Sequence, residues 1–233
     1  MVGKKMLYIQ QKLMLLILII TVVFSHPNYV ESIDAENVPD QVPSPAPPVT
    51  KYVAVADDYF NDAVFIGDSR TEGFKMLSGP LNAVYLTSIG LKVDTVAVEA
   101  LSEVPFKKVF IMLGINELGW VYSELFIEKY GELIDNIKKI EPQAQIYIQS
   151  ILPVSRERSE SDSIYNNENI NKYNELIQQM AVNKNIFYLN VAECVTDEEG
   201  YLYSDASTDG IHLNKKYCDQ WFEYIKTHVV FEQ

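Results

Sequence analysis

The sequence predicts an α/β fold: a three-layer α/β/α sandwich around a five-stranded parallel sheet. Short, unbroken apolar runs alternate along the chain with segments whose apolar residues recur every three or four positions. Unbroken runs are typical of parallel strands covered on both faces, and the longer spacing is typical of helices that bury one stripe. Their alternation indicates right-handed crossover connections between neighbouring parallel strands.

Five apolar runs are the expected strands. They span residues 63–66, 83–86, 109–113, 146–148 and 186–189, and apolar residues 151, 152 and 191 follow the last two runs. Sheets of this kind bind ligands at the carboxyl ends of their strands. Residues that carry chemistry are therefore expected just after these runs.

Helices are expected between and after the strands. A short helix over residues 70–77 follows the first strand, and a closing helix runs from about residue 214 to 228. Two longer helices are predicted from apolar stripes, formed by Phe126, Tyr130, Leu133, Ile134 and Ile137 and by Ile170, Tyr173, Ile177 and Met180. The charged stretch 156–163 is expected to be a solvated loop at the rim of the site.

The N-terminus has the features of an export segment. Three lysines and no acidic residue precede or flank the apolar run 13–24, and the small residue Ser25 follows it. This pattern over residues 1–25 fits a cleaved signal peptide. The run is shorter than the ~20 residues of a membrane span, although Tyr8 and Ile9 extend it if the segment is retained as an anchor. Both interpretations stay open.

A proline-rich stretch follows and separates this segment from the folded part. Five of the ten prolines fall between Pro39 and Pro48. Because such sequence stays extended and builds no core, residues 26–50 are expected to be a linker, either a spacer or simply a disordered leader. The remaining residues, 51–233, suffice for one domain, expected to be a monomer.

Charge limits the classes of partner. The chain has 19 basic and 32 acidic residues, a net charge of −13, which becomes −16 once the three lysines of the first 25 residues are removed. So acidic a surface disfavours nucleic acid and anionic lipid, leaving the possible N-terminal anchor as the one expected membrane contact. It favours a neutral or cationic small-molecule or glycan substrate, although solubility alone also explains it.

Cysteines and histidines give no sign of a metal site. No ligands stand at zinc-like spacing, so neither a metal nor another cofactor is expected. Cys194 and Cys218 are the two cysteines, and a disulfide or two separate buried thiols are both compatible with the sequence.

A serine, a histidine and an aspartate stand at the expected sheet edge. Ser69 follows the first strand, and His212 lies in the loop before the closing helix, three residues after Asp209. Histidine can take the proton of a serine near neutral pH, and a carboxylate can orient the imidazole. The alternatives are a helix cap at Asp68 and Ser69 and a solvated turn at Asp209 and Gly210. Asp205 is the reserve candidate for the acid.

Two further residues can supply hydrogen-bond donors. Asn116 follows the third strand, where its side-chain amide can stabilise an oxyanion without adding charge. Gly90 follows the second strand and can offer its backbone N–H at close approach, although plain turn glycines are common. Arg70, next to Ser69, and Trp120 are the expected substrate contacts. Tyr201 and Tyr203 are further aromatic candidates for stacking on a sugar, against the alternative of simple packing.

Together these residues resemble the SGNH or GDSL hydrolase family. GDS at residues 67–69 resembles its first block, Gly90 its second, GINE at 114–117 its third, usually written GxND, and residues 209–212 its fifth, DxxH. The blocks span roughly 150 residues in the family's order. Glu117 stands where the family often has Asp, at a position peripheral to the oxyanion hole.

The resemblance implies a flavodoxin-like SGNH hydrolase fold and activity on esters without a metal. It implies a Ser69, His212 and Asp209 triad with an oxyanion hole from the Ser69 amide, the Gly90 amide and the Asn116 side chain. With the N-terminal segment, the expectation is a secreted or outer-face-anchored serine esterase that hydrolyses acyl esters, chiefly acetyl, on carbohydrate. An O-acyltransferase on cell-surface polysaccharide and a non-catalytic carbohydrate-binding module are the alternatives.

Overall fold

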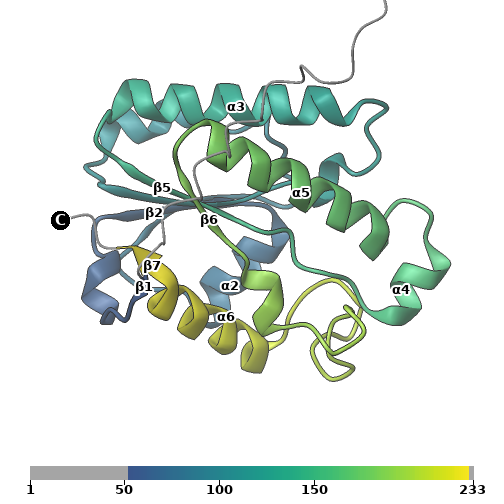
Figure 1. Ribbon diagram of the computed structural model, residues 1–233. Helices are drawn as coiled ribbons and strands as arrows, with labels where there is room; N and C mark the ends of the chain where they lie inside the picture. Colours follow the sequence, from purple (N-terminus) through teal and green to yellow (C-terminus); the bar gives the residue numbers. More distant parts are fainter. Residues whose placement is uncertain (1–51, 231–233) are drawn as a thin grey trace, which may run out of the picture. The chain divides into compact units, whose positions relative to one another are not determined.

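The computed structural model describes residues 52–230, which form a three-layer α/β/α sandwich (Figure 1). Its central sheet has five parallel strands in the order β3-β2-β4-β5-β6. The strands are β2 (Ala63–Gly67), β3 (Val84–Thr87), β4 (Lys108–Met112), β5 (Gln145–Gln149) and β6 (Phe187–Leu189). Each strand overlaps one of the apolar runs, so the predicted parallel sheet is confirmed.

Two helices cover each face of the sheet. Figure 1 shows α3 and α5 on one face and α2 and α6 on the other. Their bounds are α2 (Ser69–Leu77), α3 (Ser123–Ile140), α5 (Asn167–Asn183) and α6 (Lys215–His228). The apolar stripes of the sequence point inward, since Tyr130, Ile134 and Ile177 are fully buried. Unbroken apolar strands are needed because both faces of the sheet are covered.

Alternate strand residues feed two separate cores. Val64, Val109 and Ile146 belong to the apolar cluster that includes the buried stripes of α3 and α5. Their neighbours Phe65, Phe110 and Tyr147 belong to the cluster that includes Trp221 of α6. On that face the Phe65 and Phe110 ring centroids lie 4.9 Å apart, and those of Phe110 and Tyr147 lie 4.7 Å apart. Parallel strands in register align these rings in a row across the sheet.

One stretch differs from the sequence prediction. Residues 156–163 were expected to be a loop, but Arg156–Ser161 forms a short helix, α4. The side-chain oxygen of Ser155 accepts a hydrogen bond from the Arg158 backbone N–H and caps its N-terminus. The stretch buries no residue, so it lacks the apolar stripe on which the prediction depended.

A small second sheet joins the ends of the described chain. Strand β1 (Tyr52–Val53) pairs antiparallel with β7 (Val229–Val230), directly after α6. Two residues per strand are too few to show an alternation, and this pairing was not predicted. The 3₁₀ helices η1 (Asp57–Phe60), η2 (Val98–Glu103), η3 (Ile115–Glu117) and η4 (Val191–Cys194) complete the connections.

Some sequence predictions concern other parts of the chain. The predicted signal peptide or anchor (1–25) and linker (26–50) lie outside the described residues. Between residues 52 and 230, no helix combines the length and apolarity that crossing a bilayer requires.

Cys194 and Cys218 are free thiols, and burial raises the pKa of each to about 12. The disulfide interpretation therefore has no support in the structure.

Candidate active site

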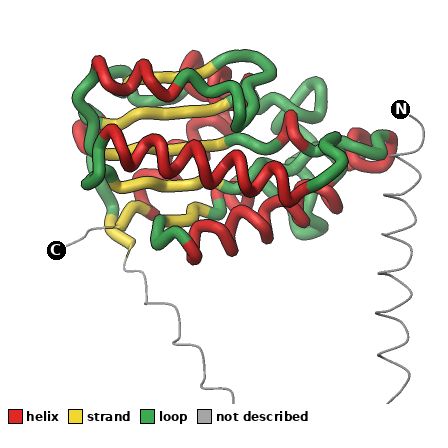
Figure 2. Tube along the Cα trace, turned by 90° about the horizontal axis from the view of Figure 1, so that it is seen from above, coloured by secondary structure: helices red, strands yellow, loops and turns green. Residues whose placement is uncertain are grey.

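The segments that carry Ser69, Gly90 and Asn116 leave the sheet at one end. Gly67 at the end of β2 is in register with Thr87 of β3 and with Met112 of β4. The three segments that begin with Asp68, Ser88 and Leu113 therefore leave the sheet side by side. Figure 2 shows the strands running in parallel, with loops and short helices gathered beyond their ends.

Ser69 is the first residue of α2, directly after β2. Asp68 is the N-cap: its side chain is buried and accepts a hydrogen bond of 2.9 Å from the Arg70 N–H. Capping, the alternative role considered for both residues, thus falls to Asp68. The Ser69 hydroxyl is directed elsewhere, toward the loop before α6. Ser69 also stands where the free amides and the dipole of α2 favour a negative charge.

Ser69, His212 and Asp209 form a continuous line of hydrogen bonds. The distance from Ser69 Oγ to His212 Nε2 is 2.9 Å, and that from His212 Nδ1 to Asp209 Oδ2 is 2.6 Å. The other carboxylate oxygen of Asp209 accepts from the backbone N–H groups of Ile211 and His212 and from the Ser207 hydroxyl. The structure thus brings together the three residues expected as nucleophile, base and acid, with the spacing that proton transfer requires.

The environment of Asp209 keeps its carboxylate charged. Burial by itself would raise the pKa of Asp209, but the hydrogen bonds from His212, Ile211 and Ser207 outweigh it and hold the pKa well below its usual range. The reserve candidate, Asp205, turns away: its oxygens bind Lys216 and the Tyr217 hydroxyl at the start of α6. Asp209 is thus the carboxylate that meets the imidazole.

The two expected oxyanion donors lie on neighbouring segments. Gly90 is the third residue of a turn closed by a 3.2 Å bond from the Leu91 N–H to the Ser88 carbonyl, and its φ of +74° is one that glycine adopts without strain. Asn116 lies on η3, after β4, and its side-chain Nδ2 donates to the Leu91 carbonyl at 3.0 Å. One N–H of the Asn116 amide therefore holds the Gly90 turn, and an amide nitrogen has a second.

Glu117 is a member of this region whose role sequence reasoning missed. It was regarded as peripheral, yet it is fully buried and accepts a 2.7 Å hydrogen bond from the Val93 backbone N–H. Burial raises the pKa of Glu117 to about 7, against the lowering effect of that hydrogen bond. The one signal of its role in the sequence was an acidic residue in a mostly apolar segment directly after a predicted strand.

Arg70 does not have the surface position that the prediction of a substrate contact requires. Its side chain is 3% exposed, and Nη1 donates to the Leu152 carbonyl at 2.6 Å. Burial lowers the pKa of Arg70 to about 10, against the opposing effect of the Asp68 and Asp209 carboxylates. Because Arg70 is the second residue of α2, the helix turns it inward while Ser69 faces the edge. Arg70 is corrected to an internal residue beneath the site.

The aromatic candidates are mainly engaged in packing. Trp120 is partly buried against the core on the α3 side, and its neighbours Val121 and Tyr122 are exposed. The face of Tyr201 is covered by the Arg156 guanidinium, 4.3 Å from the ring centroid, and Tyr203 stacks on Tyr217 at 5.6 Å. Trp120 stays a predicted substrate contact.

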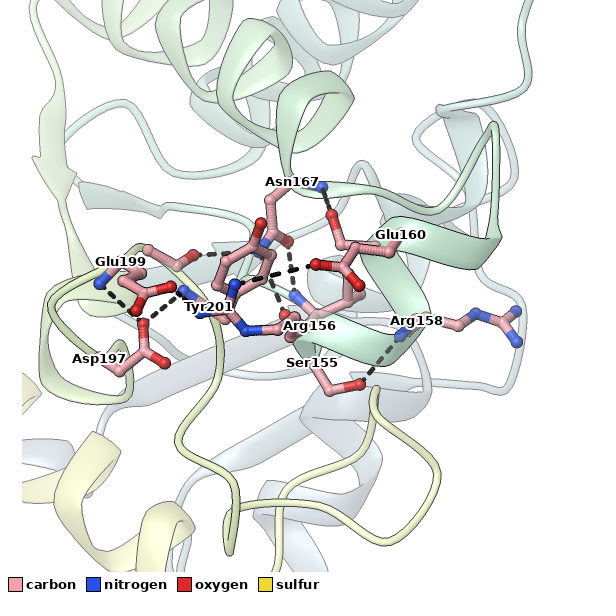
Figure 3. Close-up of polar contacts among 11 residues, drawn as sticks. Ser155, Arg156, Arg158, Glu160, Asn167, Asp197, Glu199 and Tyr201 are labelled. Atoms are coloured by element: carbon pink, nitrogen blue, oxygen red, sulfur yellow. Dashed lines mark hydrogen bonds and ion pairs between the residues drawn. The ribbon is translucent and has the colours of Figure 1, made fainter.

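A polar cavity lies beside Asp209, on the side of α4. Its volume is about 520 Å³, and its lining includes Ser155, Arg158, Ser204 and Asp209. Figure 3 shows how α4 is tied to the adjacent loop: Arg156 pairs with Glu199, and Asp197 accepts from the Glu199 and Tyr201 backbone N–H groups. At the start of α4, the Ser155 N–H also donates to the carbonyl of Gly210, in the loop that carries Asp209 and His212.

The described residues contain no cluster of metal ligands. Among residues 52–230, no group of three or more histidine, cysteine, aspartate or glutamate side chains is arranged to hold a metal ion.

A serine, histidine and carboxylate in line at the carboxyl edge of an α/β/α sandwich form the arrangement of a serine hydrolase. Residues 65–217 match the model of the GDSL-like lipase/acylhydrolase family. This match extends over more than half of the 233 residues, so the chain belongs to that family. It is a serine hydrolase that acts on ester bonds, as the four sequence blocks predicted. No curated protein matches the chain.

Solved structures share the fold at low sequence identity. A GDSL-like lipase from Bacteroides thetaiotaomicron is 18% identical with a TM-score of 0.56, over 74% of this chain and 88% of its own. A carbohydrate esterase family 3 protein from Talaromyces cellulolyticus is 15% identical (TM-score 0.55, 70% and 94% covered). A carbohydrate acetylesterase from Sinorhizobium meliloti is 14% identical (TM-score 0.53, 70% and 96% covered).

Proposed function

We propose that this protein is an exported serine esterase that removes short acyl groups, acetyl above all, from carbohydrate, with Ser69, His212 and Asp209 as its triad. The observation that carries the proposal is the unbroken hydrogen-bonded line from Ser69 Oγ through the imidazole to Asp209. The N-terminal residues 1–25, with their basic and then apolar sequence, support export or attachment to the outer face of the membrane.

In the proposed reaction, His212 Nε2 takes the Ser69 proton while Oγ attacks the carbonyl carbon of the ester. The carbonyl π electrons move to the oxygen, and the Ser69 amide, the Gly90 amide and the second N–H of Asn116 stabilise it. The imidazolium then protonates the departing sugar oxygen, which leaves an acyl-serine. Water, deprotonated by His212, attacks that ester, and the acid departs as Ser69 regains its proton.

The exposure of the site supports an ester of a bulky alcohol. The side chains of His212 and Asp209 are 47% and 52% exposed, so a large, branched sugar can approach without a closed channel. The polar cavity beside Asp209 offers hydroxyl and charged groups to a sugar. The names of two structural neighbours, a carbohydrate esterase and a carbohydrate acetylesterase, point to the same class of substrate.

A covalent probe and an acetate assay test the proposal on the full-length protein. Intact-mass analysis after exposure to a fluorophosphonate should give one adduct on the wild type, none on Ser69→Ala and slow labelling on His212→Ala. Acetate release from acetylated xylan should exceed the cleavage of p-nitrophenyl octanoate in kcat/KM. An unlabelled, folded wild type would contradict the triad, and preference for the octanoyl ester would contradict the substrate class.

A further inference from the structure

The Gly90 turn has little support of its own. Ser88, Ile89 and Gly90 are exposed, with the Ile89 side chain 86% exposed, and a single backbone hydrogen bond closes the turn. An exposed turn with so few contacts would ordinarily move. An oxyanion donor works only when it is held in place before the reaction, since catalysis by such donors depends on their not having to reorganise.

Two adjacent side chains on η3 hold the segment that follows Gly90. The Asn116 amide donates to the Leu91 carbonyl at 3.0 Å, and the Glu117 carboxylate accepts from the Val93 N–H at 2.7 Å. These anchors fall one and three residues after Gly90. Val93 is only 3% exposed, so its N–H would lose this partner without gaining water.

Glu117 is itself fixed from several elements. Its backbone N–H donates to the Gly114 carbonyl, and its carbonyl accepts from the Tyr173 hydroxyl of α5 at 2.9 Å. The Tyr173 ring in turn stacks on Phe126 of α3, with centroids 4.8 Å apart. The backbone of Glu117 is therefore tied to the packed α3 and α5 face of the sheet, not to the exposed edge.

The burial of Glu117 makes a passive packing role a poor explanation. One carboxylate oxygen, Oε2, is buried with no hydrogen-bond partner within the described residues, which an apolar side chain of similar size would avoid. A buried acid with one unsatisfied oxygen needs an explanation, and its single hydrogen bond, to the Val93 N–H, supplies one. What it fixes is the segment that begins at Gly90.

We propose that Glu117 is a positioning residue that, together with Asn116, holds the Gly90 turn and so fixes one donor of the oxyanion hole. This role rests on the function proposed above. Glu117 touches neither the ester nor the triad, and it acts through the Val93 N–H. The effect is therefore expected in kcat more than in KM, because an oxyanion forms only in the transition state.

Two substitutions by side chains similar in size to glutamate separate the effect of the hydrogen bond from the effect of side-chain volume. Glu117→Gln keeps an oxygen that can accept from the Val93 N–H, whereas Glu117→Leu leaves that N–H buried and unpaired. Thr95→Val is the matched control: Thr95 Oγ1 accepts from the Lys92 N–H in the same segment, but this hydrogen bond is exposed, so water can replace it. All three are made in the full-length protein.

The measurements are kcat and KM for p-nitrophenyl acetate and amide hydrogen exchange of residues 88–93. Glu117→Leu should lower kcat at least about tenfold, which is less than the 10²–10³-fold loss expected when a donor is removed. It should change KM less than about twofold and speed the hydrogen exchange of residues 88–93. Glu117→Gln should restore most of kcat, and Thr95→Val should leave kcat and the exchange of residues 88–91 unchanged. The double variant Glu117→Leu/Asn116→Ala should lose less than the product of the single losses.

Different outcomes overturn different claims. Faster exchange in Glu117→Leu with an unchanged kcat would refute the positioning role, and unchanged exchange would refute the anchoring itself. A lower kcat in Glu117→Leu that Glu117→Gln fails to restore would also refute the positioning role. An inactive wild type that a fluorophosphonate does not label would refute the proposed function, and exchange alone would then decide whether Glu117 holds the turn.

Discussion

The two halves of the candidate site are held in different ways. The acid and base lie on an exposed loop, where Asp209 binds backbone groups two and three residues away. The Gly90 turn is held through Leu91 and Val93, which bind Asn116 and the buried Glu117, 25 and 24 residues further along the chain. Local hydrogen bonds suffice for the first half, because the carboxylate and the imidazole need only face each other. The donor half depends on the packed core.

The largest expected effect comes from the acid. Asp209→Asn should lower kcat for p-nitrophenyl acetate on the order of 10³–10⁴-fold, because an amide N–H beside Nδ1 favours the wrong imidazole tautomer. The asparagine oxygen can still accept from the Ile211 and His212 N–H groups, so the loop should keep its shape. Asp205→Asn is the matched control, since that carboxylate faces α6. Equal losses in both variants would contradict the assignment of Asp209.

A smaller effect is expected where the loop meets α4. Gly210 has a φ of +78°, and a Cβ there would lie 2.4 Å from Ser155 Oγ, so Gly210→Ala must displace either the loop or the helix cap. The Ser155 N–H also donates to the Gly210 carbonyl at 2.9 Å. We expect kcat to fall about tenfold, because a small misplacement of His212 is costly.

Gly200→Ala is the matched control for crowding. Gly200 has a φ of +90°, and a Cβ there would meet no atom within 4 Å, so this variant carries the backbone strain alone, about 1–2 kcal/mol. Thermal unfolding and kcat are measured for both variants and for Gly210→Ala/Ser155→Gly. The double variant should recover part of the lost kcat. If Gly200→Ala lowers kcat as much as Gly210→Ala does, contact with Ser155 is not the cause.

The contrast between local and long-range hydrogen bonds also explains which features could be predicted from the sequence. The order and type of the strands follow from unbroken apolar runs, and the pairing of Asp209 with His212 follows from their separation of three residues. Glu117 and Val93 are distant in sequence, and nothing local marks their hydrogen bond. Arg70 appears polar and accessible in the sequence, and only the direction of α2 turns it inward. Long-range contacts of single polar groups are what sequence patterns leave out.

The smallest expected effect is on the free energy of unfolding, which should change with pH through Glu117. Burial, reinforced by the Asp68 carboxylate and opposed by the Val93 hydrogen bond and Lys92, raises the pKa of Glu117 from 4.5 to about 7. The folded protein therefore holds a proton on Glu117 between these values, while the unfolded chain releases it. As pH rises through this window, the free energy of unfolding should fall by at most about 1.4 kcal/mol per pH unit, and level off above pH 7.

Glu117→Gln removes this titration and leaves every other group in place. Urea unfolding of both proteins from pH 4 to 8 should give a difference in stability that shifts in favour of the variant up to pH 7 and is constant above it. Parallel curves would contradict the raised pKa. Asp209 does not interfere, because its lowered pKa places its loss of stabilising charge at pH values below this window. The buried Glu117 on the donor half should thus reduce stability as pH rises through its window, whereas the exposed Asp209 on the proton-transfer half should reduce stability as pH falls below that window.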